Sequence, residues 1–231
     1  LKPYEKYNPV ESKWIDTIPS TWGYKKVKEL FIERKERNNP IKTHEILALT
    51  AKQGVIPYSQ KESSGGNKTK EDLTQYNLAH PNDLLINCMN IVSGAAGVSR
   101  YYGAISPVYY ALSQRDDSIN IWYYHTIFRF MPFQRSLLGL GKGILMHESS
   151  SGALNTVRMR IPMSNLNNVM LPVPSREEQD KIVRFLDWKL AKINKFIKAK
   201  KKLIAVLKEQ KQAIINQAVT KGIDSNVKMK P

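Results

Sequence analysis

The sequence PVPSREEQ, residues 172–179, opens an uninterrupted run to Gly222 that determines the architecture of the chain. Its two prolines disfavour a helix before Ser175, whose hydroxyl is suited to cap one. Glu178 stands at the third helical position, where a capping box places an acidic side chain. Neither Pro nor Gly interrupts the run before Gly222. The pattern therefore predicts a single helix of about 65 Å that ends at this glycine.

Apolar side chains recur along the predicted helix at seven-residue spacing and form a stripe wider than a two-column coiled-coil seam. Lys189, Lys200 and Gln210 interrupt its rows. A helix of this length cannot bury such a stripe against itself, so it requires a partner helix from this chain or from another. The stripe comprises Leu186, Ile193, Leu207 and Ile214 in one row, Ile182, Phe196 and Leu203 in a second, and Val183, Leu190, Ile197 and Ile204 in a third.

The chain is strongly basic, with a formal net charge of +16. Residues 175–231 carry 15 basic and 6 acidic side chains, a net of +9, and the preceding residues carry the remaining +7. Such a surface either aids solubility or binds a polyanion, and nucleic acid is favoured over a membrane. The lysines opposite the apolar stripe fit either interpretation: Lys192, Lys195, Lys198, Lys201, Lys202 and Lys208.

Length and composition indicate one sizeable domain in addition to the helix, since the 231 residues are 42% hydrophobic. The single cysteine, Cys88, excludes an internal disulfide and fits a reducing compartment. The sequence shows neither a long apolar run nor a signal-peptide pattern. We therefore expect a cytoplasmic protein without membrane contact.

Residues 1–174 are predicted to form one globular domain of mixed α/β (α+β) class, residues 175–221 the helix, and residues 222–231 a tail or the lead-in to a second repeat. Trp14 and Trp22 flank a proline turn and are expected to clamp the N-terminal segment onto the core. The local patterns predict a helix within 24–37, strands at 45–50, 83–87 and 155–162, a turn with an apolar plug at 54–58, and a helix within 119–131.

No catalytic motif stands out. The four histidines show no metal-ligand spacing, and Gly139–Gly143 lacks the spacing of a phosphate-binding loop. Cys88 has no motif that marks a nucleophile. We expect Asp116 and Asp117 to form a turn at a helix start, and the chain to be non-catalytic with no metal site.

Four motifs occur in a characteristic order: WI…IP…W at 14–22, LT…GVIP at 49–57, LPVP…EQ…I…FLD at 171–187, and KEQKQAII…AVTKG at 208–222. Together they resemble the specificity subunit of type I restriction–modification systems. The resemblance implies a target recognition domain followed by a long conserved helix, a pair that occurs twice in a full subunit. Each recognition domain would read one half of a bipartite site in double-stranded DNA.

The resemblance further implies a non-catalytic subunit that binds modification subunits, with restriction subunits joining the complex. S-adenosylmethionine, ATP and magnesium would belong to those partners, and this chain would bind no cofactor. The sequence holds only one domain–helix unit, so it is either a half-length subunit or half of a longer chain. We expect an antiparallel homodimer that reads an interrupted palindrome. The dimerisation residues would be Ile182, Leu186, Ile193, Phe196, Leu203, Leu207 and Ile214.

Recognition domains vary, so the resemblance transfers no base contact to a particular residue. Candidates follow instead from residue types that read base edges or phosphates, where these fall on predicted loops. An ordinary surface role is the alternative for each of them. The DNA-binding candidates are Lys52, Gln53, Lys68, Lys70, Asn87, Asn90, Ser93, Arg100, Tyr101, Lys142, Ser150 and Arg158.

Two other classes of protein remain open from the sequence. One is a coiled-coil scaffold whose positive charge is incidental. The other is an enzyme with an undetected site, such as a nuclease. A log–log dependence of DNA affinity on salt separates the first from a DNA reader, and cleavage by the isolated chain would indicate the second.

Overall fold

The computed structural model describes residues 4–50, 53–61, 72–143, 146–148, 154–156 and 159–223, without the side chains of 146–148 and 154–156. The chain forms two compact units, Leu1–Lys181 and Ile182–Pro231. The first contains the strands, the short helices and the first turn of the long helix α5 (Arg176–Lys221), and the second contains the rest of α5.

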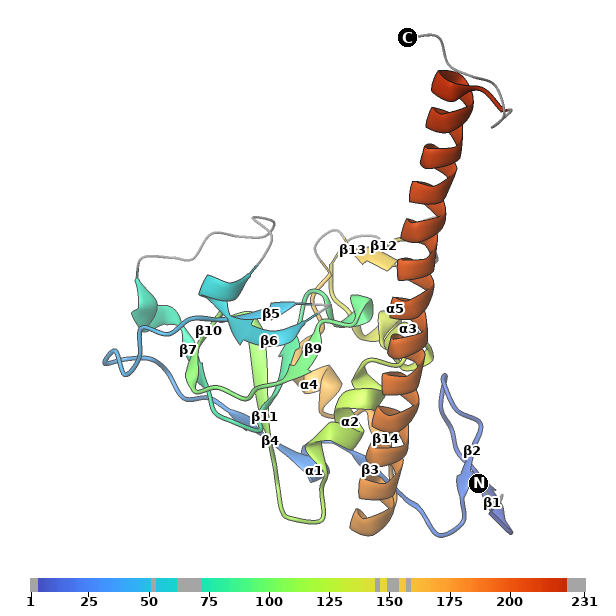
Figure 1. Ribbon diagram of the computed structural model, residues 1–231. Helices are drawn as coiled ribbons and strands as arrows, with labels where there is room; N and C mark the ends of the chain where they lie inside the picture. Colours follow the sequence, from blue (N-terminus) through green and yellow to red (C-terminus); the bar gives the residue numbers. More distant parts are fainter. Residues whose placement is uncertain are drawn as a thin grey trace. The chain divides into compact units, whose positions relative to one another are not determined.

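The centre of the first unit is a four-stranded antiparallel sheet with the order β4-β11-β8-β9 (Figure 1). Its strand β8 carries Leu84, Leu85 and Ile86, which are all fully buried and confirm the buried strand expected at 83–87. The hydrophobic residues of the sheet are thereby removed from water, which is the main favourable term in folding. The strands are β4 (Phe31–Arg34), β8 (Leu84–Asn87), β9 (Ala96–Val98) and β11 (Tyr109–Gln114).

Two-stranded antiparallel pairs surround this sheet. The pair β5–β6 is a hairpin that packs its Leu49 and Val55 against Gly97 of β9, where a Cβ atom would come within 3.1–3.3 Å of the hairpin. The other pairs are β1 (Tyr7–Pro9) with β2 (Thr17–Pro19), β3 (Gly23–Lys26) with β14 (Met170–Val173), β7 (Asn77–Ala79) with β10 (Gly103–Ile105), and β12 (Met146–Glu148) with β13 (Leu154–Thr156); the hairpin joins β5 (Leu47–Thr50) and β6 (Gly54–Pro57).

Aromatic side chains join the helices to the sheet. Tyr124 meets Phe31 of β4 edge to face at 5.2 Å, and Phe128 meets Phe133 at 5.1 Å. Trp14 packs on the same Phe133 ring at 5.2 Å, which confirms that it clamps the N-terminal segment onto the core. The helices are α1 (Val27–Leu30), α2 (Ile121–Phe128), α3 (Met131–Ser136) and α4 (Met163–Leu166), with 3-10 turns η1 (Tyr58–Gln60), η2 (Leu73–Gln75), η3 (Ile91–Ser93) and η4 (Leu138–Leu140).

Two local expectations were wrong, and the strand expected at 155–162 is described only as the end of β13 at Thr156 and a bridge at Arg160. Residues 24–37 form β3, a single helical turn and β4 instead of one helix, because β3 pairs with β14 and β4 pairs with β11. Residues 54–57 form a strand instead of a turn, because they pair with β5. Tertiary pairing overrides local helical spacing in both places. The α+β fold class with one long C-terminal helix is confirmed.

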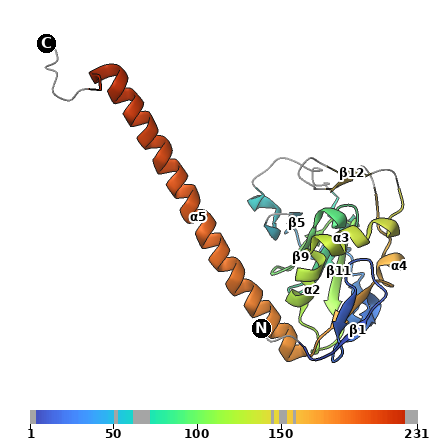
Figure 2. The same cartoon turned by 90° about the vertical axis from the view of Figure 1, so that its right-hand side faces the viewer.

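The long helix begins and ends close to the predicted residues (Figure 2). The backbone N–H of Glu178 donates to the Ser175 hydroxyl at 3.3 Å, and Gly222 adopts the left-handed conformation with φ of 75°. The Glu178 carboxylate accepts hydrogen bonds from Trp22 Nε1 at 3.0 Å and from the Tyr4 hydroxyl. Trp22 thus holds the N-terminal segment to the first turn of α5. The division of roles among residues 1–174, 175–221 and 222–231 stays a prediction.

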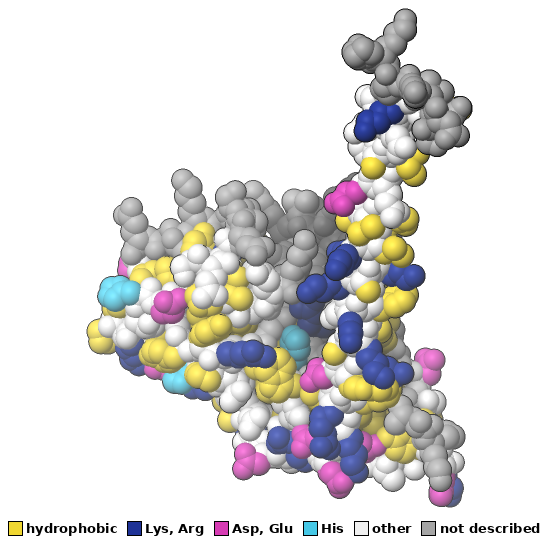
Figure 3. Space-filling model, in the orientation of Figure 1, with side chains coloured by type: hydrophobic (Ala, Val, Ile, Leu, Met, Phe, Trp, Pro, Cys, Tyr) yellow, Lys and Arg dark blue, Asp and Glu magenta, His cyan; other side chains and the backbone are white. Residues whose placement is uncertain are grey.

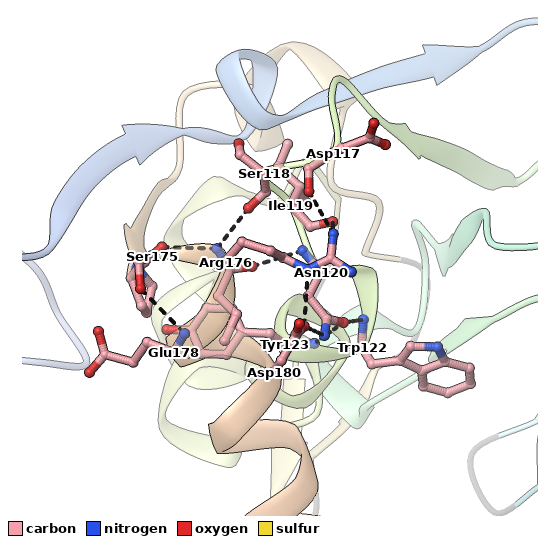
Figure 4. A network of polar contacts seen from close by, with 12 residues as sticks. Asp117, Ser118, Ile119, Asn120, Trp122, Tyr123, Ser175, Arg176, Glu178 and Asp180 are labelled. Atoms are coloured by element: carbon pink, nitrogen blue, oxygen red, sulfur yellow. Dashed lines mark hydrogen bonds and ion pairs between the residues drawn. The ribbon is translucent and has the colours of Figure 1, made fainter.

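A polar network joins the first turn of α5 to the segment that precedes α2 (Figure 4). Gln179 is fully buried at its centre. Its amide nitrogen donates to the carbonyls of Ser118 at 3.1 Å and Pro174 at 2.9 Å, and its carbonyl accepts from the backbone N–H of Asn120 at 2.8 Å. One side chain therefore satisfies three backbone groups.

Arg176 and Asp180 complete this network on its outer side. The Arg176 guanidinium donates to the carbonyls of Asp117 at 2.6 Å and Ile119 at 3.2 Å, and it pairs with Asp180 at 2.9 Å. The Asn120 side chain donates to Asp180 at 2.6 Å and accepts from the first backbone N–H groups of α2. The same asparagine thus caps α2 and binds α5.

We predict that Gln179→Leu lowers the free energy of unfolding by about 2–4 kcal/mol, because it leaves three buried backbone groups without a partner. Urea unfolding followed by tryptophan fluorescence measures the change. Gln60→Leu, at an exposed position in η1, is the matched control and should change stability little. Equal stabilities for the two variants would contradict this role of Gln179.

Candidate nucleic-acid interface

The described DNA-binding candidates lie in separate places on the first unit. Strands β8 and β9 are antiparallel, with Leu84 opposite Val98 and Ile86 opposite Ala96. One end of this strand pair therefore carries Asn87, Asn90 and Ser93. The other end carries Arg100 and Tyr101. Lys52, Lys68, Lys70, Ser150 and Arg158 lie outside the described residues.

At the first end, Asn87 has a structural part in the turn after β8. It is only 9% exposed, and its side-chain oxygen accepts the Met89 N–H at 3.0 Å. Gly94 closes η3 in the left-handed conformation, with φ of 81°. This turn leaves Asn90 and Ser93 exposed to solvent.

Lys142 lies in a short antiparallel bridge to Arg160, with backbone N–H to carbonyl distances of 2.8 and 2.9 Å. Both side chains are exposed.

Next to this bridge, burial raises the pKa of the Cys88 thiol, so the thiolate that a nucleophile requires is disfavoured.

Gln53 is exposed in the turn of the β5–β6 hairpin. Its backbone N–H donates to the Thr50 hydroxyl at 3.0 Å, and that hydroxyl donates to the Gly54 carbonyl at 3.2 Å. Gly54 adopts φ of 70°, which glycine allows without steric cost. The Thr50 hydroxyl therefore links the backbone of Gln53 to that of Gly54.

At the opposite end of β9, a group of aromatic and basic side chains lies on the surface. The Arg100 guanidinium lies 5.7 Å from the centre of the Trp122 ring, and Tyr102 meets His80 edge to face at 5.0 Å. Tyr101 and Tyr102 are each 38% exposed. Aromatic and arginine side chains of this kind offer stacking surfaces to bases.

Several ionisable groups of the first unit are paired in structural contacts. Glu36 contacts Lys42 at 2.6 Å and His80 at 2.7 Å, and these two partners hold the pKa of its carboxyl below the usual value. Burial lowers the pKa of His125 to about 4, and the charge of Arg129 adds to the shift.

Among the described residues, no group of three or more acidic, histidine or cysteine side chains is arranged to hold a metal ion.

The apolar stripe of α5 is exposed along most of the second unit, whereas Ile182, Val183 and Leu186 at its start are half-buried. Ile193, Phe196, Leu203, Leu207 and Ile214 keep between 47% and 68% of their surface accessible. Figure 3 shows hydrophobic and basic side chains alternating along α5 on the visible face. Within the described part of the chain, no helix is both long enough and apolar enough to cross a bilayer.

Some lysines of α5 cover its aromatic rings. The Lys192 ammonium lies 4.0 Å and that of Lys189 5.0 Å from the centre of the Trp188 ring, and Lys200 lies 5.3 Å from the centre of Phe196. Cation–π contacts at exposed sites are worth about 0.5–1 kcal/mol each. Trp188, 49% exposed, was not among the predicted contact residues because it falls outside the heptad rows.

No protein-family model matches the sequence, and no curated protein matches it. Several solved structures do resemble the fold, and two of them have TM-scores above 0.5. One is described as the structural basis underlying complex assembly and conformational transition of the type I R-M system, with a TM-score of 0.59, 19% identity, and coverage of 89% of this chain and 47% of that chain. The other is the HsdS subunit from Thermoanaerobacter tengcongensis, with a TM-score of 0.52, 20% identity, and coverage of 89% and 46%.

The chain has the fold of the specificity subunits of type I restriction–modification systems, which confirms the resemblance that the sequence motifs indicate. It spans about half the length of the solved chains that it matches. These likenesses concern the fold, and they assign no function to individual residues of this chain.

We predict that stability falls as the pH decreases from about 6.5 to about 4, because the unfolded chain protonates His125 in this range whereas the folded chain keeps it neutral. His125→Gln should flatten this part of the curve of unfolding free energy against pH. Urea titrations at several pH values measure it, with the exposed His44→Gln as control. An unchanged slope in His125→Gln would contradict the assignment.

Proposed function

We propose that this chain is a DNA-specificity component of a type I restriction–modification complex. The observation that carries the proposal is the fold shared with HsdS subunits over 89% of the chain. The net charge of +16 supports it, because a basic surface attracts the DNA backbone. The first unit reads one half of a bipartite site in this proposal.

Within the first unit, the exposed candidates have the chemistry that base and phosphate recognition requires. Gln53 and Asn90 carry amides that pair with adenine edges, and Arg100 pairs best with guanine or a phosphate. Tyr101 offers a ring for stacking and Lys142 a charge for phosphate. Asn87 contributes by holding the turn that presents Asn90.

The second unit supplies pairing in this proposal. The exposed stripe is a large apolar surface in contact with water. Burying each of its aliphatic or aromatic side chains would stabilise a paired state by about 1.5–3 kcal/mol. An antiparallel helix from a second copy, or from a second domain–helix unit, would cover it. Two identical units related by two-fold symmetry would read an interrupted palindrome.

Methyl transfer and cleavage would belong to modification and restriction subunits, together with S-adenosylmethionine, ATP and magnesium. This chain would then contribute DNA sequence specificity and a surface that binds the modification subunits.

We predict that the chain directs methylation when the modification subunit and S-adenosylmethionine are supplied. Sequencing that detects modified bases should reveal one bipartite motif, and it should be palindromic if two copies of this chain pair. The isolated chain should neither methylate nor cut DNA. Methylation without sequence preference, or cleavage by the chain alone, would contradict the proposal.

We also predict that Ile193→Asp with Leu207→Asp shifts the chain from dimer to monomer, because two carboxylates would be buried in the paired stripe. Sedimentation at micromolar concentration measures the state. Lys195→Asp with Lys202→Asp introduces the same groups on the opposite face and should leave the dimer intact. A wild-type chain that is monomeric yet reads its motif in full would exclude pairing.

A further inference from the structure

Four basic side chains converge on a cavity of about 210 Å³ at the outer edge of the central sheet. None of them was among the sequence candidates. The cavity is lined by Arg34, Lys35 and Arg37, which follow one another along the chain, by Arg160, and by the rings of Tyr109 and Tyr110.

The cavity exists because the chain changes partners after β4. Arg34 is the last residue of β4 and pairs with Ala111 of β11. Two residues later the Glu36 carbonyl accepts the Leu78 N–H at 2.9 Å, and Arg37 then bridges to Asn77 of β7. The chain therefore leaves β11 and joins β7, and the fork between these strands opens beside Lys35.

Arg160 enters the fork from another part of the chain. Next to it in the sequence, the Ile161 carbonyl accepts a hydrogen bond from the Tyr110 hydroxyl at 3.0 Å. The backbone of Arg160 is held by the bridge to Lys142. These contacts place Arg160 beside Tyr110 in the lining of the cavity, with its side chain exposed to solvent.

Positive charge exceeds negative charge in the fork. Arg34 is neutralised by two hydrogen bonds to Asp83, at 2.7 and 3.1 Å. Glu33, the only carboxylate among the lining residues, is 3.6 Å from Lys35, whose side chain is 80% exposed. A pair this exposed contributes little. Lys35, Arg37 and Arg160 therefore leave an excess of positive charge facing the cavity.

The size and position of the cavity suit a phosphate group. A water molecule takes about 30 Å³, so the cavity has room for a phosphate and bound water. Tyr109 at its rim is opposite Asn87 in the β11–β8 register. The cavity thus lies at the same end of the strands as Asn90, Ser93 and Lys142, and away from Arg100.

We propose that this cavity binds one phosphodiester of the DNA backbone and thereby sets the Asn90–Ser93 end of the domain against the duplex. The inference rests on the proposed function, since it assumes that the partner is DNA. Phosphate contacts position a protein without reading sequence. The site would therefore contribute affinity equally for target and non-target DNA.

The test is the salt dependence of duplex binding by the full chain. Lys35→Gln with Arg37→Gln should lower the magnitude of the slope of log K against log salt by about 0.9, the value for one phosphate contact. Affinity for target and non-target duplexes should fall by the same factor. Arg160→Gln should lower the slope by no more than this amount, because the same phosphate is concerned. Lys25→Gln with Lys28→Gln removes the same charge from exposed positions elsewhere in the first unit and should leave the slope unchanged.

Each other outcome overturns the inference in a recognisable way. The phosphate site would be contradicted by unchanged slopes in the two fork variants (Lys35→Gln with Arg37→Gln, and Arg160→Gln) that unfold thermally as the wild type does. That result would leave the proposed function intact. Equal losses in the Lys25–Lys28 variant would show a general charge effect. Stabilisation of the wild type, but not of the fork variants, by millimolar inorganic phosphate, with unchanged DNA slopes, would assign the cavity to free phosphate. A wild-type chain with no DNA affinity would overturn both proposals.

Discussion

The buried amide of Gln179 is the contact on which the start of the long helix depends. An amide has a donor and an acceptor on one planar group, and here it satisfies two carbonyls and one N–H. Leucine of similar volume would leave all three unpaired, and glutamate would place a carboxylate against two carbonyl oxygens. The first turn of α5 is therefore part of the first unit, which extends to Lys181.

Beyond that turn the helix is governed by a different constraint. Its backbone hydrogen bonds are satisfied within the helix, but its apolar stripe is not covered by anything that the structure describes. The cation–π contacts of Lys192 and Lys200 cover the faces of only two rings, Trp188 and Phe196. A paired state would remove this stripe from water, which is why pairing is central to the proposed function.

The basic charge is distributed between two kinds of environment. On α5 the lysines are spread along an exposed face, where salt screens them. In the first unit Lys35, Arg37 and Arg160 are held together by a fork in strand pairing. Their gathering around one cavity makes the second group the better candidate for a defined contact, because several charges then act on the same bound group.

The sequence alone determined the helix and the family resemblance. Ser175, Gly222 and the seven-residue spacing act through neighbours within a few positions, so they can be read locally. The tertiary structure decided the rest. Whether residues 24–37 form helix or strand, whether Asn87 is exposed, and whether Lys35 and Arg160 meet all depend on pairing between distant segments. Such contacts depend on which strands pair in the folded chain. The local sequence around these residues does not specify that pairing.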